Sequence, residues 1–249
     1  MGIIGRLFLW LILCRSAGCA WNDVVDQDYD RKTTRCRNRP IARGALTTAN
    51  GCWLASCLVT LALLPLLSLP GGCIKLAFVA VALTIFYPFA KRVTNFPQVV
   101  LGVIAAVTVA LAAYAANVEA LSDSHSTPTL CLMSTVVLHL VFYDLIYSRE
   151  DATDDMKSGV KSMAVLCRDY MPLLLGGLAL GATVLTFALG MMVDLGTGYF
   201  ILAVGGQLLG LDSLVIFTLL RRENEVKKLG GWCFLVAFGS LLVAFATQM

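Results

Sequence analysis

Apolar residues fill eight long stretches of the chain, and short polar segments separate them. A stretch of about 20 apolar residues is long enough to cross the hydrocarbon core of a bilayer as a helix. The pattern predicts an all-α polytopic membrane protein, a bundle of about eight transmembrane helices around a central cavity that opens to the cytosolic side. The expected spans cover approximately residues 3–22, 49–69, 72–90, 97–117, 128–148, 170–192, 198–220 and 230–248.

Positive charges gather in alternate connections between these spans. Arg and Lys residues follow the first, third, fifth and seventh spans, whereas the opposite connections hold only Lys75, near a helix end. Cytoplasmic connections carry an excess of Lys and Arg, so strict alternation places all four basic connections in the cytosol or its organelle equivalent. Because hydropathy alone defines the spans, the charge asymmetry supports their number independently.

Composition agrees with the membrane class. The chain is 58% hydrophobic and 14% charged, with a mean hydropathy of +0.80, which excludes an ordinary soluble globule. Most of the nine cysteines lie inside or beside apolar segments, where they behave as small hydrophobes. No CxxC pair exists, and His125 and His139 lie away from any cysteine pair, so we do not expect a zinc site.

The polar stretch after the first span carries a high density of carboxylates. Asn22, Asp26 and Asp30 are four residues apart, so a continuous helix would place them within about 80° of one face. Carboxylates stacked in this way repel, and a divalent cation removes the repulsion. A cluster of hard oxygen ligands suits Mg²⁺. The alternative is a helix end that forms salt bridges with the Arg and Lys run at residues 31–43.

A second cluster follows the fifth span with the same spacing. Tyr147, Asp151 and Asp155 are again four residues apart. Two acidic helix faces with nearby cations would form a cradle for Mg²⁺ and a diphosphate. A solvated cytosolic loop is the alternative interpretation. Asp144, Asp154, Lys157 and Lys161 surround this cluster.

Three of the polar residues inside the expected spans are assigned an interpretation of their own. A charged side chain within a span is costly without a partner, so we expect Arg15 to have a functional role or a buried partner. We interpret His139 as a packed helix residue. Asp212 is an acid inside the membrane, and such residues commonly have a function. No motif includes it, so it remains a candidate for helix pairing.

Four motifs occur in an order that resembles the UbiA-type membrane prenyltransferases. The family's first signature is similar to NDVVDQDYD at residues 22–30 with NRP at 38–40, and RSAGC at 15–19 matches what usually precedes it. The central loop of the family is similar to YPFAKR at 87–92 with PQ at 97–98. The second aspartate signature is similar to YDLIY at 143–147, followed by Asp151, Asp154, Asp155, Gly159, Lys161 and Ser162.

The resemblance covers residues 15–162 by motif and the remainder by helix pattern. It implies a single UbiA-like domain over residues 1–249. The branch that it resembles contains 4-hydroxybenzoate polyprenyltransferases and fungal enzymes that prenylate phenolic polyketides in meroterpenoid pathways. The family usually has one more helix before the first signature, so we expect either a short gene model or a lost helix, which would open the cavity to lipid.

The resemblance also implies a reaction, the transfer of an allylic prenyl group from its diphosphate to an aromatic ring. Asn22, Asp26 and Asp30 would hold one Mg²⁺, and Asp151 and Asp155 a second. Lys91, Arg92 and Lys161 would stabilise the diphosphate as it leaves. Asp154 would influence removal of the ring proton, which completes the catalytic set Asp26, Asp30, Asp151, Asp154 and Asp155. The remaining expected substrate-binding residues are Arg15, Arg35, Arg39 and Tyr147.

The expected partners are an isoprenoid diphosphate, a phenolic acceptor and the lipid bilayer, with no nucleic acid. No clear mitochondrial presequence precedes the first span, which favours an endomembrane over the mitochondrial inner membrane and secondary metabolism over quinone-precursor synthesis. A cleaved signal peptide at residues 1–20 is the rival interpretation of the first span, but Arg15 interrupts its apolar run.

Two other functions remain open at this stage. A truncated family member would bind isoprenoid diphosphate or a partner without turnover. A transporter would use the polar groups inside the membrane, but transporters commonly contain internal repeats with broken helices. We find no convincing repeat, and the acids cluster at one membrane boundary rather than at the midplane.

Overall fold

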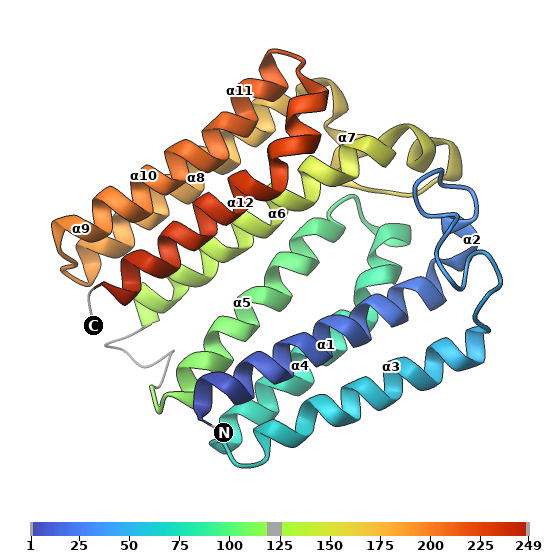
Figure 1. Ribbon diagram of the computed structural model, residues 1–249, viewed down its shortest axis with the longest axis horizontal. Helices are drawn as coiled ribbons and strands as arrows, with labels where there is room; N and C mark the ends of the chain where they lie inside the picture. The colour runs from blue at the N-terminus through green and yellow to red at the C-terminus, as the bar shows by residue number, and fades with distance from the viewer. Residues whose placement is uncertain (1, 119–125, 248–249) are drawn as a thin grey trace. The chain divides into compact units, whose positions relative to one another are not determined.

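The computed structural model describes residues 2–118 and 126–247, and all regular structure within them is helical (Figure 1). Eight helical spans in this part of the chain are long and apolar enough to cross a membrane. The protein is therefore an integral multi-pass membrane protein, and the predicted fold class and number of spans are confirmed. The spans cover Ile3–Val25, Thr48–Leu66, Gly71–Val93, Pro97–Ala115, Ser126–Ser158, Arg168–Met192, Thr197–Leu219 and Asn224–Ala246.

The outward faces of the spans are apolar. Ile4, Trp53, Leu173 and Trp232 are among many large hydrophobic side chains that are mostly exposed. A soluble monomer rarely exposes contiguous apolar surface of this extent, whereas lipid tails cover it without cost. The arrangement is that of helices whose backbone groups are bonded internally and whose side chains face lipid.

The chain divides into two compact units, which we describe separately. Of the described residues, the first unit contains 2–118 and 149–166, and the second contains 126–148 and 167–247. The long helix α6 (Ser126–Ser158) contributes its first part to the second unit and its last part to the first. The central cavity stays a prediction, as does the single domain.

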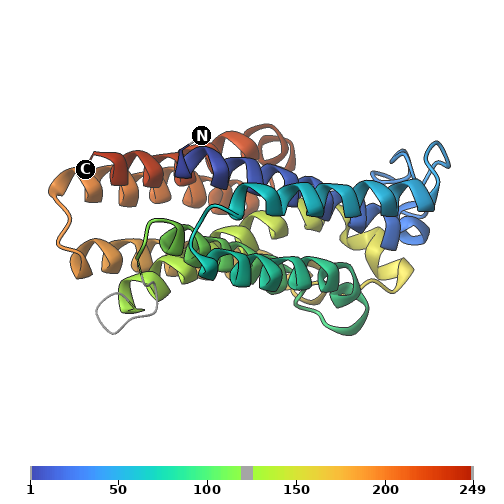
Figure 2. The ribbon, with the colours of Figure 1, turned by 90° about the horizontal axis from the view of Figure 1, so that it is seen from below.

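In the first unit, α1 (Ile3–Val25) lies along α3 (Thr48–Leu63), and α4 (Gly71–Val93) lies along α5 (Pro97–Ala115) (Figures 1 and 2). Small residues in the core let these helices approach closely, as is usual in membranes. The shorter elements are α2 (Gln27–Asp30), η1 (Leu64–Leu66) and α7 (Met163–Leu166). The buried core contains Trp10, Ala62, Leu66, Cys73, Ala77, Ala80, Leu111 and Ala115.

Local sequence explains where several helices begin. The Thr47 hydroxyl accepts a hydrogen bond from the Asn50 N–H at 3.2 Å and caps α3. Pro97 and Pro172 lie in the first turns of α5 and α8 (Met171–Met192), where the missing N–H costs nothing. Polar and proline residues at the membrane boundary therefore fix the starts of spans that hydropathy locates only approximately.

In the second unit, α12 (Glu223–Ala246) packs along the span Thr197–Leu219 (Figures 1 and 2). Two π-helical segments, whose turns are wider than those of an α-helix, interrupt this span. The Tyr199 hydroxyl donates to the Thr186 carbonyl of α8 at 2.9 Å and fixes the start of the span. Its elements are α9 (Thr197–Tyr199), η3 (Phe200–Val204), α10 (Gly205–Gln207), η4 (Leu208–Asp212) and α11 (Ser213–Leu219), and η2 (Arg168–Tyr170) precedes α8.

Two buried polar residues of the second unit, His139 and Gln207, are hydrogen-bonded, whereas Asp212 has no such bond to a described residue. His139 is fully buried, with Nδ1 2.8 Å from the Thr135 carbonyl and Nε2 2.7 Å from Gln207 Oε1, so its predicted packing role is confirmed. Gln207 also donates to the Ala237 carbonyl at 3.2 Å. The Asp212 carboxylate forms no ion pair or hydrogen bond with another described residue, and its candidate role in helix pairing stays a prediction.

A glycine sets the distance between η4 and α12. A Cβ added to Gly210 would lie 2.5 Å from the Cys233 carbonyl oxygen and 2.9 Å from the Ala237 nitrogen, both backbone atoms that cannot move aside easily. We expect Gly210→Val to destabilise the protein by about 2 kcal/mol or more through overpacking. Thermal unfolding in detergent measures this effect.

Gly205 offers the matched control, because nothing lies within 4 Å of a Cβ added there. Gly205→Val should leave the unfolding temperature nearly unchanged. Equal unfolding temperatures for the two variants would contradict the close packing of η4 against α12.

Candidate functional site

The first acidic signature lies where α1 ends. The helix stops at Val25, because Asp26 leaves helical geometry and the Gln27 side-chain amide donates to the Val24 carbonyl at 3.1 Å. The helix is therefore not continuous through this residue. The Asp26 N–H still bonds the Asn22 carbonyl, and the Asp30 N–H still bonds the Asp26 carbonyl, both at 2.8 Å. The four-residue register thus persists across the break.

Lys91 at the end of α4 contacts this signature directly. Its Nζ lies 2.7 Å from Asp26 Oδ2 and 3.2 Å from Asn22 Oδ1. The Asp26 side chain is 6% exposed, so a cation beside it compensates the loss of water. The structure therefore brings together the predicted metal ligands Asn22 and Asp26 and the predicted phosphate ligand Lys91.

Arg92 contacts the same end of α1 in a different way. It donates to the Val25 carbonyl at 2.9 Å, where the broken helix leaves a free acceptor. Its guanidinium lies 5.4 Å from the ring centroid of Tyr29 and 5.6 Å from that of Phe89, which are cation–π distances. Arg92 therefore fixes the helix end.

The basic loop between α2 and α3 reaches the second acidic signature. Arg35 Nε lies 2.9 Å and 3.2 Å from the two Asp151 oxygens, and its Nη2 also contacts Asp151. This pairing raises the pKa of the Arg35 guanidinium. The Thr34 N–H donates to Asp154 Oδ2 at 3.2 Å. Two adjacent residues of the loop thus bind the last turns of α6, which brings both signatures into one unit.

Arg39 binds the first signature from the other side. Its Nη1 donates to Asp23 Oδ1 at 2.9 Å and to Asp30 Oδ2 at 3.0 Å. Burial raises the pKa of the Asp30 carboxyl, Arg39 opposes this rise, and the neighbouring Asp26 and Asp23 charges add to it. The Asp30 side chain therefore needs a nearby cation to stay ionised at this position.

A short segment after α6 places Lys161 beside Lys91. Gly159 ends the helix with a φ of +74°, a left-handed conformation that glycine adopts without strain. The Lys161 N–H then donates to the Lys91 carbonyl at 2.9 Å, and the Met163 N–H donates to Gln98 Oε1 at 3.3 Å. These two bonds fix the backbone on either side of Lys161, whose side chain is exposed.

Charges from three parts of the chain act on Asp155. Its carboxylate lies within electrostatic range of Asp151, Lys91 and Arg35. Lys91 therefore interacts with the first signature by direct contact and with the second by its charge. The two groups of predicted metal ligands thus share one neighbouring cation, Lys91.

The donor set fits a particular kind of metal binding. Among the described residues, no three His, Cys, Asp or Glu side chains lie close enough to form a ready-made metal cage. Mg²⁺ is usually held by one or two carboxylates, with water and substrate phosphate completing its shell. Carboxylates that are each paired with a cation suit Mg²⁺ that arrives with a diphosphate, and the predicted metal ligands stay a prediction.

Two predicted site residues lie apart from these contacts. Arg15 is exposed on α1, and its Nη1 donates to Cys19 Sγ at 2.9 Å, so it has no carboxylate partner among the described residues. Tyr147 belongs to the second unit, where its side chain is 51% exposed. A Cβ on Gly230 of α12 would lie 3.8 Å from its hydroxyl. The substrate-binding role of both residues stays a prediction.

Sequence reasoning assigned no role to two residues that the structure places at the site. Asp23 shares Arg39 with Asp30, and Gln98, 2% exposed, holds the segment that carries Lys161. Both lie inside the family motifs, at the second position of NDVVDQDYD and in the PQ pair. Their positions within those motifs were the feature of the sequence that could have identified them as site residues.

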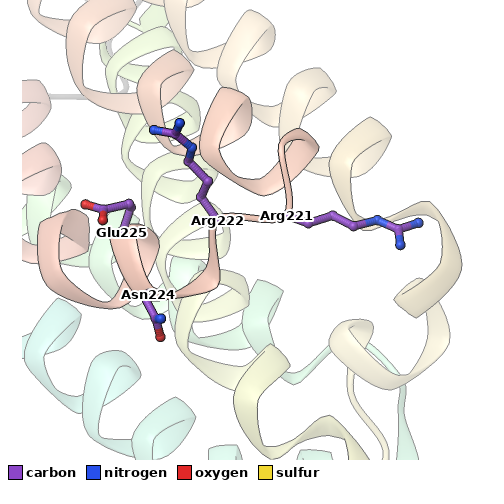
Figure 3. Close-up of a pocket in the computed structure, with 4 residues that line it drawn as sticks. All are labelled: Arg221, Arg222, Asn224 and Glu225. Carbon is purple, nitrogen blue, oxygen red and sulfur yellow. The ribbon is translucent and has the colours of Figure 1, made fainter.

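A separate hollow of about 290 Å³ lies in the second unit, at the turn between α11 and α12. Figure 3 shows the Arg221 and Arg222 side chains pointing in different directions there. Asn224 and Glu225 complete its lining. None of the predicted site residues lines it, so it does not belong to the candidate site.

Comparison with known families decides the identity. The profile of the UbiA prenyltransferase family matches residues 2–242. The chain belongs to the UbiA prenyltransferase family. Its predicted activity as an aromatic prenyltransferase of this family is therefore confirmed, and a prenyl diphosphate and an aromatic acceptor follow as its substrate classes.

Two fungal proteins resemble this UbiA family member over most of its length. Prenyltransferase stbC from Stachybotrys bisbyi is 43% identical over 239 residues, which cover 96% of this chain and 72% of the relative. The prenyltransferase ascA from Acremonium egyptiacum is 46% identical over 241 residues, which cover 96% of this chain and 71% of the relative. The predicted fungal branch of the family is thereby confirmed.

A solved structure supports the fold independently. The apo structure of a UbiA homologue from Aeropyrum pernix K1 matches with a TM-score of 0.81 at 22% sequence identity. The match covers 97% of this chain and 86% of that chain. The UbiA fold is therefore retained although most residues differ.

The ion pair between Lys91 and Asp26 yields a test of the site's construction. Lys91→Gln would leave the buried Asp26 carboxylate without its cation, and we expect a loss of about 2 kcal/mol of stability because the lysine is partly solvated. The unfolding temperature in detergent, without Mg²⁺ or diphosphate, measures this loss.

The exposed Lys32 provides the matched control, since Lys32→Gln makes the same chemical change on the surface. Adding Asp26→Asn to Lys91→Gln should restore part of the stability, because the unpaired charge is then gone. A Lys91→Gln variant as stable as Lys32→Gln would refute the pairing.

Proposed function

We propose that the protein transfers a prenyl group from an isoprenoid diphosphate to the ring of a phenolic acceptor, with Mg²⁺ bound by both aspartate signatures. The supporting observation is that carboxylates of both signatures are already paired with cations from more distant parts of the chain. Lys91 pairs with Asp26, Arg39 with Asp30, and Arg35 with Asp151. Each pair offers one ligand for Mg²⁺ and one for a phosphate oxygen.

The carboxylates would hold the metal ions in two groups, one of Asn22, Asp26 and Asp30, and the other of Asp151 and Asp155. Bound Mg²⁺ would neutralise the negative charge that develops on the diphosphate when the carbon–oxygen bond breaks. Asp154 receives a hydrogen bond from the Thr34 N–H, which orients it. We assign Asp154 the role of influencing removal of the ring proton.

The cations of the site would bind the diphosphate oxygens. Lys91, Arg35 and Arg39 would exchange their bonds to Asp26, Asp151 and Asp30 for bonds to phosphate oxygens, so their charge remains within the site throughout. Arg92 and Lys161 lie beside Lys91 and would add to the positive field. These cations would stabilise the negative charge that develops on the leaving group as the carbon–oxygen bond breaks.

Arg15 is suited to the acceptor rather than to the donor. It lies seven residues before Asn22 on α1, about 10 Å along the helix and deeper in the membrane. Among the described residues its side chain bonds a thiol alone, which leaves most guanidinium donors available for an anionic group. We assign it to the carboxylate of a phenolic acid.

The pathway is part of the same proposal. The similar fungal prenyltransferases favour meroterpenoid biosynthesis over quinone-precursor synthesis. An endomembrane is then the expected location. A prenyl donor and a phenolic acid would meet at the cytosolic boundary that carries both signatures.

Turnover in membranes tests the proposal. Membranes containing the full chain should release diphosphate and form a prenylated phenolic acid from geranyl, farnesyl or geranylgeranyl diphosphate only when Mg²⁺ is present. Asp26→Ala and Asp151→Ala should each lower the rate by about 100-fold or more, because they remove ligands of the two proposed metal ions. Chromatography of the labelled product measures the rate.

Asp169→Ala is the control, since Asp169 is exposed and pairs only with its neighbour Arg168. It should retain the wild-type rate. Binding of the diphosphate by wild-type protein without any turnover would support the non-catalytic alternative, and full activity in chelator would exclude the role of Mg²⁺.

Arg15 can be tested through the acceptor. Arg15→Gln should raise KM for a phenolic acid by about 10-fold, the size of one lost charge-assisted bond, while KM for the prenyl diphosphate stays unchanged. The same phenol without its carboxylate should show no difference between wild type and variant. Arg6→Gln, at the opposite end of α1, serves as the control. A matching rise in KM for the diphosphate would contradict this assignment.

A further inference from the structure

One guanidinium nitrogen in the first unit is shared by two carboxylates. Arg39 Nη1 lies 2.9 Å from Asp23 Oδ1 and 3.0 Å from Asp30 Oδ2. The Asp30 side chain is 9% exposed, whereas those of Asp23 and Arg39 are 25% and 31% exposed. The more buried acid of the two is the one that belongs to the proposed metal-binding register.

Asp23 cannot take the same role as Asp30. It follows Asn22 by one residue, about 100° around the helix from the face that Asn22 and Asp26 share. Its carboxylate instead points at Arg39, with which it forms a hydrogen-bonded ion pair. Asp23 therefore acts on the signature through a cation, not as part of the oxygen cluster.

The proposed metal binding creates a conflict for Asp30. Its Oδ2 accepts from Arg39, and a Mg²⁺ ion on Asp30 would weaken or replace that bond by repelling the guanidinium. If Asp30 were the only partner of Arg39, metal binding would release the arginine into solvent. A second carboxylate on the same nitrogen keeps the arginine in place.

We propose that Asp23 is a positioning residue that retains Arg39 beside the first signature while Asp30 exchanges its bond to Arg39 for Mg²⁺. The proposal rests on the function proposed above. It assigns the two carboxylates different tasks, since Asp30 changes partner and Asp23 does not. Arg39 then remains where it can bind a phosphate oxygen of the donor.

Asp23→Asn tests this role. The variant would leave Arg39 bound chiefly by Asp30, so Mg²⁺ would have to compete with an unshared ion pair. With purified full chain in detergent and saturating inorganic diphosphate, we expect the Mg²⁺ concentration for half-maximal thermal stabilisation to rise about five-fold, the size of one partly exposed ion pair. Asp23→Glu keeps the charge and should recover most of the wild-type value.

Asp28→Asn is the matched control. Asp28 lies five residues away in the same segment and also pairs with an arginine, Arg31, at 2.9 Å, but its side chain is 80% exposed. The Asp28→Asn variant removes one negative charge and leaves the contacts of Arg39 unchanged. We expect the half-maximal Mg²⁺ concentration of this variant to equal that of the wild type.

Arg39→Gln separates positioning from a simple loss of negative charge. Without Arg39, adding Asp23→Asn should leave the half-maximal Mg²⁺ concentration unchanged, whereas a plain charge effect would raise it by the same factor as before. That second result would overturn the proposal, as would equal values for Asp23→Asn and Asp28→Asn. A wild-type protein that Mg²⁺ and diphosphate do not stabilise would instead refute the proposed function itself.

Discussion

The site depends on the pairing of a buried carboxylate with a lysine from another helix. Asp26 lies at the membrane boundary with little access to water, and Lys91 compensates its charge at 2.7 Å. The same lysine bonds Asn22 and acts on Asp155 by its charge. One cation thus joins both acidic signatures, and the ends of α1, α4 and α6 belong to one unit.

This arrangement brings opposite charges together before any substrate arrives. Unpaired charges with little access to water are costly, and pairing a carboxylate with a cation offsets part of that cost. The ligands for a metal ion and for a diphosphate therefore lie together. The loop carrying Arg35 and Arg39 supplies two of these cations, although it has little regular structure of its own.

The sequence predicted the spans and the motifs because both depend on local composition. Hydropathy and the charge asymmetry located all eight spans, and spacing singled out Asp26 and Asp151. The break at Asp26 was not predictable, because it depends on a side-chain bond from Gln27 to the backbone. The partners of Arg35 and Arg39 were not predictable either, since spacing along a chain does not say which acid a flexible loop will reach.

The attachment of the segment after α6 has one more consequence. Its bond to α4 joins the Lys161 N–H to the Lys91 carbonyl, so neither lysine side chain takes part in it. Substitution of the exposed Lys161 can therefore alter the local charge while the backbone keeps its course. The charge here can vary through one side chain, without a change in the connection between α6 and α4.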